Sequence, residues 1–377
     1  MLLSAVVLAT LAQATPIVGD HARIRGSLFN PGERDFYSFA AQAGDVVYAA
    51  TQTSFSAGDG NTVLAIVDAS GTVVESDDDD GSYALYASSL AGTVLPARGT
   101  YYLRVSGATP ASTARPYDLY FQLRRGVPGY ETEPNDDFLN PQPLPAGGWV
   151  GGQINYTGDD DVYGFTANAG DTIFISVDLR GETRLPRTRI MMGIFEGYLT
   201  SAEHGLTSQA MAFTVKNTGS YEVALDTGQG PYVLSVTAFP AADASACTTL
   251  STLVNGAIPA LGSVSGTLEV PDDMILDDVD VLVGLDADIY QDIGIRVASP
   301  QGTSVGLVQK ISVNAPNAIS ATFDDAAAVP INWTEFYNAP VFQPQRSYRL
   351  HWLDGESSLG TWTITVDVNP NQGTYGT

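Results

Sequence analysis

Two acidic stretches carry the side chains best suited to binding chemistry, 130–138 (YETEPNDDF) and 157–163 (TGDDDVY). Pro134 disfavours a helical conformation of the residue before it, and alternate side chains of an extended chain point to the same side. The side chains that share one side are Glu131, Glu133 and Asn135, with Asp136 beside them. Calcium binds about 6–8 oxygen atoms, so one interpretation is a calcium site. The alternative is a solvated acidic linker whose Asn and Asp residues form a turn.

The overall charge restricts the possible partners. The 377-residue chain has 42 acidic and 17 basic residues, which gives a net charge of −25. This charge repels nucleic acids and anionic membrane surfaces, so neither is expected as a partner. Cys247 is the single cysteine of the sequence and excludes an intrachain disulfide framework.

The sequence contains no recognisable catalytic constellation. A serine protease requires a nucleophile, a base and an orienting acid, yet His21, His204 and His351 stand in no motif that presents a base. The segment 302–304 (GTS) superficially resembles a subtilisin nucleophile segment but is better interpreted as a turn. No His-Glu-x-x-His zinc motif is present. We therefore predict no catalytic residue and no enzymatic activity in this chain.

Strands are the elements that must position the acidic side chains. Short apolar runs such as 46–51, 172–178 and 362–368 are rich in β-branched or aromatic residues and are bounded by Gly, Pro, Asn or Asp. The 38 glycines and 21 prolines between such runs are typical of β-sandwiches. The sequence predicts an all-β fold of three tandem, jelly-roll-like β-sandwiches, for which its length is sufficient.

An internal repeat organises the first two thirds of the chain. Residues 32–51 align with 158–177 at an offset of 126 positions, which places Asp35 opposite Asp161 and Tyr37 opposite Tyr163. Further segments align at smaller offsets: 99–105 with 219–225 at 120, and 116–121 with 231–236 at 115. Strands that recur while loops change length predict two copies of one fold.

The repeated pattern resembles the bacterial pre-peptidase C-terminal domain, a jelly-roll-like β-sandwich attached to many secreted peptidases. The pattern is Asp-x-Tyr-x-Phe, Ala-Gly-Asp, an Asp-x-x-Gly turn at 68–71, and a closing Gly-Thr/Ser-Tyr followed by Tyr-x-Leu. The resemblance covers about 17–124 and 130–239, which predicts domains at 17–125 and 126–240.

The linker itself resembles the Glu-x-Glu-Pro-Asn-Asp calcium linker of the collagen-binding domains of clostridial collagenases, which belong to the same family. In those domains the linker and an Asp-rich loop share the ion. The resemblance implies calcium ligands at Glu131, Glu133, Asn135, Asp136, Asp159 and Asp161.

Residues 246–377 resemble the P domain that follows the catalytic domain of kexin- and furin-like proteases. The resemblance lies in the stretch ending at 292–293 (DI), a Ser-Pro-x-Gly-Thr hairpin at 299–303, a Phe-Asp-Asp loop at 323–325 and Gly-x-Trp at 360–362. The histidine often found before the aspartate is missing from its usual place, and the chain ends before the family's final strand. We therefore expect an incomplete sandwich with an unpaired sheet edge and a frayed strand at 360–368.

Other acidic residues leave two alternatives open. Asp324 and Asp325 either cap a turn or bind a metal, and the run 77–80 is either a solvated hairpin tip or a cation loop. A denser set forms either solvated strand ends or a P-domain calcium site: Asp272, Asp273, Asp277, Asp278, Asp280 and Asp292.

Residues 1–16 are an apolar leader that contains an Ala-x-Ala sequence at 12–14. It is either a secretory signal that lacks a basic n-region or an internal start within a longer protein, and it is too short to span a bilayer.

Together these features predict a non-catalytic, calcium-dependent accessory region of a secreted bacterial peptidase, which stabilises the enzyme or targets it to a substrate or surface. Its partner would be the peptidase catalytic domain or an extracellular protein or glycan. The alternative is a free-standing extracellular or cell-surface protein that binds protein fibres or glycans. The aromatic candidates for such a binding face are Tyr101, Tyr102, Tyr221 and Tyr232.

Overall fold

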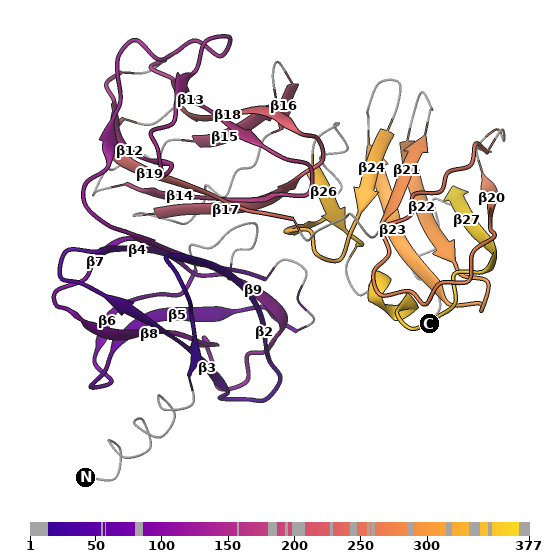
Figure 1. Cartoon of the computed structure of the whole chain (residues 1–377), viewed down its shortest axis with the longest axis horizontal. Coiled ribbons are helices and arrows are strands. Elements are labelled where there is room, and N and C mark those ends of the chain that lie inside the picture. The colour runs from indigo at the N-terminus through magenta and orange to yellow at the C-terminus, as the bar shows by residue number, and fades with distance from the viewer. Residues whose placement is uncertain are drawn as a thin grey trace. The chain divides into compact units, whose positions relative to one another are not determined.

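The computed structural model describes residues 14–53, 56, 58–79, 86–156, 158–179, 187–192, 195–197, 208–226, 229–241, 247–254, 257, 261–285, 290–313, 319–331, 340–345 and 349–368. Their regular structure is strands (Figure 1) apart from one 3-10 helix, η2 (Leu350–Leu353), so the predicted all-β sandwich fold is confirmed. No helix in these ranges is long and apolar enough to cross a membrane. The chain divides into two compact units, Met1–Ala212 with Thr218–Pro240 and Phe213–Asn217 with Ala241–Thr377.

The first sandwich of the first unit consists of two sheets. One sheet has the order β1 (Thr15–Pro16), β3 (Arg34–Ala41), β8 (Gly99–Gly107), β5 (Thr62–Asp68), β6 (Val73–Asp77). The other has the order β2 (His21–Leu28), β9 (Ala114–Arg124), β4 (Val46–Gln52), β7 (Ser89–Val94). Alternate residues of β4, Val47 and Ala49, pack into the core with residues such as Phe39, Leu103 and Leu119.

The second sandwich repeats this arrangement with one additional strand. One sheet has the order β11 (Gln142–Pro143), β13 (Asp161–Ala167), β18 (Gly219–Asp226), β15 (Arg187–Met192), β16 (Phe195–Gly197). The other has the order β10 (Gly129–Tyr130), β12 (Trp149–Ile154), β19 (Gly230–Phe239), β14 (Thr172–Asp178), β17 (Ser208–Val215). Among the described strands, β10 has no counterpart in the first sandwich.

The strand register agrees with the sequence repeat. In the first sandwich Asp35 of β3 lies opposite Val105 of β8, and in the second Asp161 of β13 lies opposite Leu225 of β18. The numbers of these partners differ by 126 and 120, the offsets found in the sequence. Corresponding residues therefore occupy corresponding places on the two sandwiches.

The second unit also contains two sheets. One has the order β20 (Gly262–Val270), β27 (Gly360–Val368), β22 (Tyr290–Ala298), β23 (Ser304–Val313). The other joins β21 (Val281–Leu285), β24 (Ile319–Phe323) and β26 (Pro340–Gln343), with β25 (Val329–Pro330) also paired to β26. The end of β17 adds to β26 through Thr214 and Val215.

The expected unpaired edge does not fall on β27. This strand pairs along its whole length with β20 on one side, and its residues 363–368 pair with β22 on the other, so it lies inside the sheet and not at its edge. The expectation of a frayed strand at 360–368 was wrong because the strand order, which the resemblance did not supply, makes β27 central.

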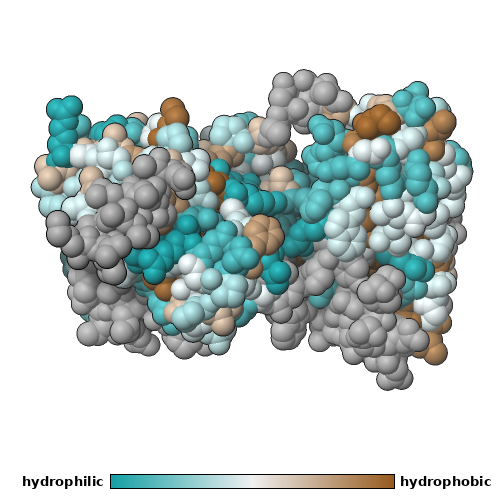
Figure 2. All heavy atoms as spheres, turned by 90° about the horizontal axis from the view of Figure 1, so that it is seen from below, coloured by the Kyte–Doolittle hydropathy of each residue, from teal (hydrophilic) through white to brown (hydrophobic). Residues whose placement is uncertain are grey.

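The predicted leader overlaps the fold at its end. Thr15 and Pro16 form β1 and pair with Tyr37 and Ser38 of β3, so the sandwich begins before residue 17. Residues 1–13, His204, Asp80 and 369–377 lie outside the described residues. On the face drawn in Figure 2, hydrophilic residues predominate and hydrophobic residues form small, separate patches, as expected from the excess of acidic residues.

Candidate metal centre

Backbone pairing fixes the acidic linker to the edge of the second sandwich. β10 runs parallel to β12. Directly after β10, the N–H of Glu131 donates to the carbonyl of Gly151 at 3.0 Å. The two carboxylate oxygens of Glu131 accept from the N–H of Gln153 at 2.9 and 3.0 Å. The sheet edge therefore determines where the first linker carboxylate lies.

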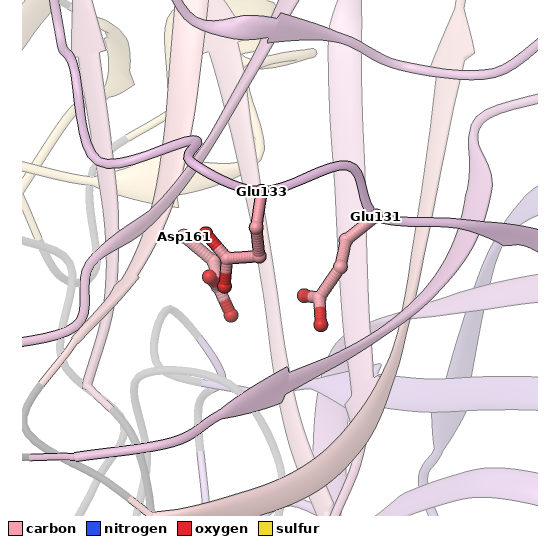
Figure 3. Close-up of side chains that lie close together, drawn as sticks. All are labelled: Glu131, Glu133 and Asp161. Atoms are coloured by element: carbon pink, nitrogen blue, oxygen red, sulfur yellow. The ribbon is translucent and has the colours of Figure 1, made fainter.

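The predicted ligand residues meet in two overlapping groups. The ligand atoms of Glu131, Glu133 and Asp161 lie within 4.8 Å of one another, and so do those of Glu133, Asp136 and Asp159. Figure 3 shows the carboxylates of Glu133 and Asp161 close together, with that of Glu131 on the same side of the linker. Because Glu133 belongs to both groups, it would contact a cation in either.

Asn135 lies between these carboxylates and is only 2 % exposed. Its side-chain amide lies 3.0 Å from Glu133 Oε2 and 3.1 Å from Asp161 Oδ1. With its nitrogen toward them the amide donates two hydrogen bonds. With its oxygen toward them it would place acceptors together, which is favourable only around a cation. The same side chain can therefore serve an empty and a loaded site in opposite orientations.

Asp161 is the most deeply buried of the acids. Its exposed fraction is 0 %, and its Oδ2 has no hydrogen-bond partner among the described residues. Burial raises the pKa of Asp161 to about 8; a hydrogen bond from the Tyr232 hydroxyl opposes this shift, and the nearby carboxylates of Glu131, Asp159 and Glu133 add to it. A buried carboxylate is costly to ionise unless a cation or hydrogen bonds compensate it. A divalent cation at this position would supply that compensation.

The loop before β13 supplies the remaining acids. Asp159 is 1 % exposed and accepts from the N–H of Asn155, which fixes its carboxylate within the loop. The linker side of the group is held by Asp136, whose Oδ1 accepts from the N–H of Asp160 at 3.0 Å. Gly158, which directly precedes Asp159 in this loop, has a φ of +96°, a conformation that favours glycine. The neighbouring acid Asp160 thus contributes its backbone to the arrangement.

Two tyrosines form the floor of the site, and the sequence analysis did not assign them a role there. The hydroxyls of Tyr163 and Tyr232 are 2.6 Å apart, and that of Tyr232 donates to Glu131 Oε2 at 3.4 Å. A Cβ at Gly152 would collide with both Glu131 Oε2 and the Tyr232 hydroxyl, so a larger residue here would displace these two side chains. The repeat alignment, which matches Tyr163 with Tyr37, was the available signal.

The donor set suits calcium. The six gathered residues offer carboxylate and amide oxygens, which are the ligands that calcium prefers. Zinc is instead bound mainly by sulfur and imidazole nitrogen, and the acidic groups of this site contain neither.

The aromatic residues predicted for a binding face are mostly core residues. Tyr101 and Tyr221 are 4 % exposed and Tyr232 is 2 % exposed, because strand alternation turns them inward. Tyr102 is partly exposed. The well-exposed tyrosines near the metal centre are Tyr130, at 76 %, and Tyr156, at 56 %.

A second acidic group lies in the second unit. The ligand atoms of Asp278, Asp280 and Asp324 are within 4.8 Å of one another. Burial and the adjacent carboxylates, Asp324 first, raise the pKa of Asp280 to about 7. Asp325 instead lies 2.8 Å from Nδ1 of His351.

The other acids of the second unit lie apart from this group. Asp273 accepts from the hydroxyl of Ser357 at 2.5 Å, while Asp272 accepts from that of Ser358 through its backbone carbonyl. The side chain of Asp292 lies outside the described residues. The predicted aspartates therefore form no single site.

No protein-family model and no curated protein matches the chain. Solved structures give low similarities. The lysozyme inhibitor PliG of Aeromonas hydrophila is 18 % identical, with 29 % of this chain and 96 % of that chain covered and a TM-score of 0.23. PliG of Salmonella Typhimurium is 19 % identical, covering 29 % and 97 %, with a TM-score of 0.21. The CUB1-EGF-CUB2 region of human MASP-1/3 is 6 % identical, covering 58 % and 100 %, with a TM-score of 0.17. These values carry no argument about function.

Proposed function

We propose that this chain is a calcium-dependent, non-catalytic accessory region of a secreted bacterial peptidase, with two pre-peptidase C-terminal-type sandwiches and a P-like sandwich that stabilise or target the enzyme. One observation carries the calcium part of the proposal. The buried Asp161 carboxylate, with an unpartnered oxygen, faces the carboxylates of Glu131 and Glu133. The family motifs of the sequence carry the peptidase part.

The position of the site suggests how calcium would act. Glu131 and Glu133 belong to the linker, whereas Asp159 and Asp161 belong to the sandwich. A shared cation would replace the repulsion between these acids with attraction to a common charge. Calcium would therefore fix the linker to the sandwich and stabilise the folded state against unfolding and proteolysis.

The non-catalytic part of the proposal is consistent with the surroundings of His351. This residue forms a base-and-acid pair with Asp325. Among the described residues, no serine, threonine or cysteine hydroxyl or thiol hydrogen-bonds to His351. Nucleophilic catalysis requires such a contact. Purified chain should therefore fail to hydrolyse casein, and turnover lost on Ser304→Ala would contradict the proposal.

A free-standing binding protein is the second candidate. Tyr130 is 76 % exposed and Leu139 is 75 % exposed at the two ends of the linker, and Tyr156 is 56 % exposed in the loop that carries Asp159. Aromatic and apolar side chains around a cation are suited to contact a protein fibre or a glycan. Binding of collagen fibres or polysaccharide by the isolated chain, weakened by Tyr156→Ala, would favour this candidate.

Calcium titration of the full chain tests the main proposal. Calorimetry in calcium should show heat of binding and a higher melting temperature than in chelator, while Glu133→Ala should abolish most of both. Magnesium at the same concentration is the control for ionic strength. Equal melting temperatures in calcium and in chelator would leave the acids as a solvated linker.

A further inference from the structure

Two arginines of the first sandwich stand without an acidic partner, although the chain carries 42 acidic residues. The ion pairs of the described residues in this sandwich involve three other arginines, Arg23, Arg25 and Arg125. No described carboxylate pairs with Arg34 or Arg104. Arg104 is partly buried, and its Nε has no hydrogen-bond partner among the described residues. A guanidinium without an acceptor of its own is suited to bind an anionic ligand through its planar donors.

Strand register gathers these arginines with two aromatic residues on one face of the sheet. Residues directly opposite each other in a strand pair share a face. The opposite pairs of β3 and β8 are Arg34 with Ser106, Phe36 with Arg104, and Ser38 with Tyr102. Diagonal neighbours on one face lie about 7–8 Å apart. Arg34 is thus the diagonal neighbour of Arg104, and Phe36 is the diagonal neighbour of Tyr102.

This face points away from the core of the sandwich. Tyr37 and Leu103, which alternate with the residues of the face, belong to the core cluster. Phe36 and Tyr102 are partly exposed, and Arg34 is exposed. β8 pairs with β3 on one side and with β5 on the other, so the face offers side chains and no strand edge. A ligand on this face would therefore be held by side chains.

The second sandwich has the same strands without these residues. At the repeat offsets of 126 and 120, the places of the two arginines and the two aromatic residues are taken by Asp160, Val162, Glu222 and Ala224. None of the four is basic or aromatic, and Val162 and Ala224 are 0 % exposed. The shared framework folds without arginine or an aromatic ring at these positions. The residues of the first sandwich are therefore not required by the fold.

We propose that this face of the first sandwich binds a glycan that carries carboxylate groups, such as one with uronic acid units. A carboxylate pairs with the guanidinium groups of Arg34 and Arg104, and the apolar face of a sugar ring lies against Phe36 and Tyr102. The site belongs to the other sandwich from the metal centre and involves no calcium. It gives the proposed targeting role a class of ligand.

Charge and topology favour an acidic sugar over other anions. Burial and the charge of Arg34 both lower the pKa of Arg104, so a carboxylate beside them would stabilise the charged form. The net charge of −25 opposes densely charged polymers such as nucleic acids, whereas a glycan with widely spaced carboxylates is repelled less. An acidic peptide that adds to a sheet requires a strand edge, which this face lacks.

A fluorescently labelled hyaluronan hexasaccharide, with one carboxylate per disaccharide, is the probe for this site. Anisotropy with the full chain in chelator should show saturable binding. Arg34→Gln and Arg104→Gln should each weaken binding at least about 10-fold, because each removes a charged hydrogen bond to the carboxylate. Tyr102→Ala should also weaken it, since it removes part of the aromatic surface. Arg98→Gln, at an exposed position of the same sandwich, removes the same charge and should bind as the parent does.

Neutral chitohexaose and a hexaglutamate peptide are the competing probes. Hyaluronan binding that is lost in Arg34→Gln and kept in Arg98→Gln supports the inference. Equal affinity for chitohexaose overturns it, because the carboxylate is then not recognised, and tighter binding of hexaglutamate overturns it in favour of an acidic peptide. Absence of binding, or an equal loss in Arg98→Gln, overturns it as well. Binding that requires calcium would place the ligand at the metal centre instead. The effect of calcium on the melting temperature tests the proposed metal centre separately.

Discussion

The two sandwiches of the first unit place the same residues in the same register and yet give one aspartate two different environments. Asp35 is partly exposed and accepts a hydrogen bond from the Tyr117 hydroxyl. Asp161 is buried beneath the linker, where its Oδ2 has no described partner and the Tyr232 hydroxyl donates to Glu131. The same strand position is thus partly exposed in one copy and buried among other carboxylates in the other.

The linker causes this difference. It brings the carboxylates of Glu131 and Glu133 beside the buried Asp161, and both burial and neighbouring like charges disfavour the charged form of a carboxyl group. Burial and the nearby carboxylates raise the pKa of Asp161 to about 8, and burial and Glu33 raise the pKa of Asp35. In each copy a hydrogen bond from a tyrosine hydroxyl, that of Tyr232 or of Tyr117, opposes the shift. A metal centre can therefore arise from a repeated fold by laying one acidic strand along its edge.

Of the predicted changes, removal of calcium should give the largest loss of stability, and this loss should come from the second sandwich. At about 100-fold excess over the dissociation constant, a ligand of the folded state adds about 2.7 kcal/mol of stability. For a unit of this size that corresponds to a shift in melting temperature of roughly 5–10 °C. Differential scanning calorimetry of the full chain in calcium and in chelator measures it. Asp79→Asn, at an exposed position of the acidic run 77–80, is the control and should keep the whole gain; an equal loss there would show a general effect of charge.

Asp161→Asn should change stability in opposite directions with and without calcium. In chelator at a pH above about 8, where Asp161 is ionised, the substitution removes an uncompensated buried carboxylate, so stability should rise by about 1–3 kcal/mol, the range for a buried polar group without a partner. In calcium it removes a ligand charge, so the gain from the ion should be mostly lost. Urea unfolding of the variant and the parent, in calcium and in chelator, measures the direction of the stability change in each condition. A variant less stable than the parent in chelator would mean that Asp161 is already compensated without an ion.

The pH dependence in chelator follows from the same carboxylate. The folded pKa of Asp161, about 8, lies above its ordinary value of 3.8, so the folded state binds the proton more tightly. The stabilisation from protonated Asp161 is therefore complete below about pH 4 and is lost as pH rises toward about 8, at up to about 1.4 kcal/mol per pH unit. Urea unfolding at pH 5, 6, 7 and 8 should show this decline in the parent and a flatter profile in Asp161→Asn. Matching profiles would refute the assignment.

The sequence predicted the ligand residues of the site better than the tyrosine pair beneath them or the order of the strands. The offsets of the repeat anticipated the register of β3 with β8 and of β13 with β18. The six predicted ligands also meet, because they lie close together in the sequence on either side of one sheet edge. The tyrosine floor and the central place of β27 were not predicted. Both depend on which strands lie beside each other across long sequence separations, and local periodicity does not encode that order.

Asp35→Asn should give the smallest effect and is the matched partner of Asp161→Asn. The substituted side chain keeps an oxygen that can accept from the Tyr117 hydroxyl, and the position is partly exposed, so little solvation is lost or gained. Stability in chelator should stay within about 0.5 kcal/mol of the parent, as for most substitutions outside special sites. The gain of the full chain from calcium should remain, because the linker and Asp161 are intact. Loss of that gain on Asp35→Asn would place the ion in the first sandwich and reverse the comparison between the two copies.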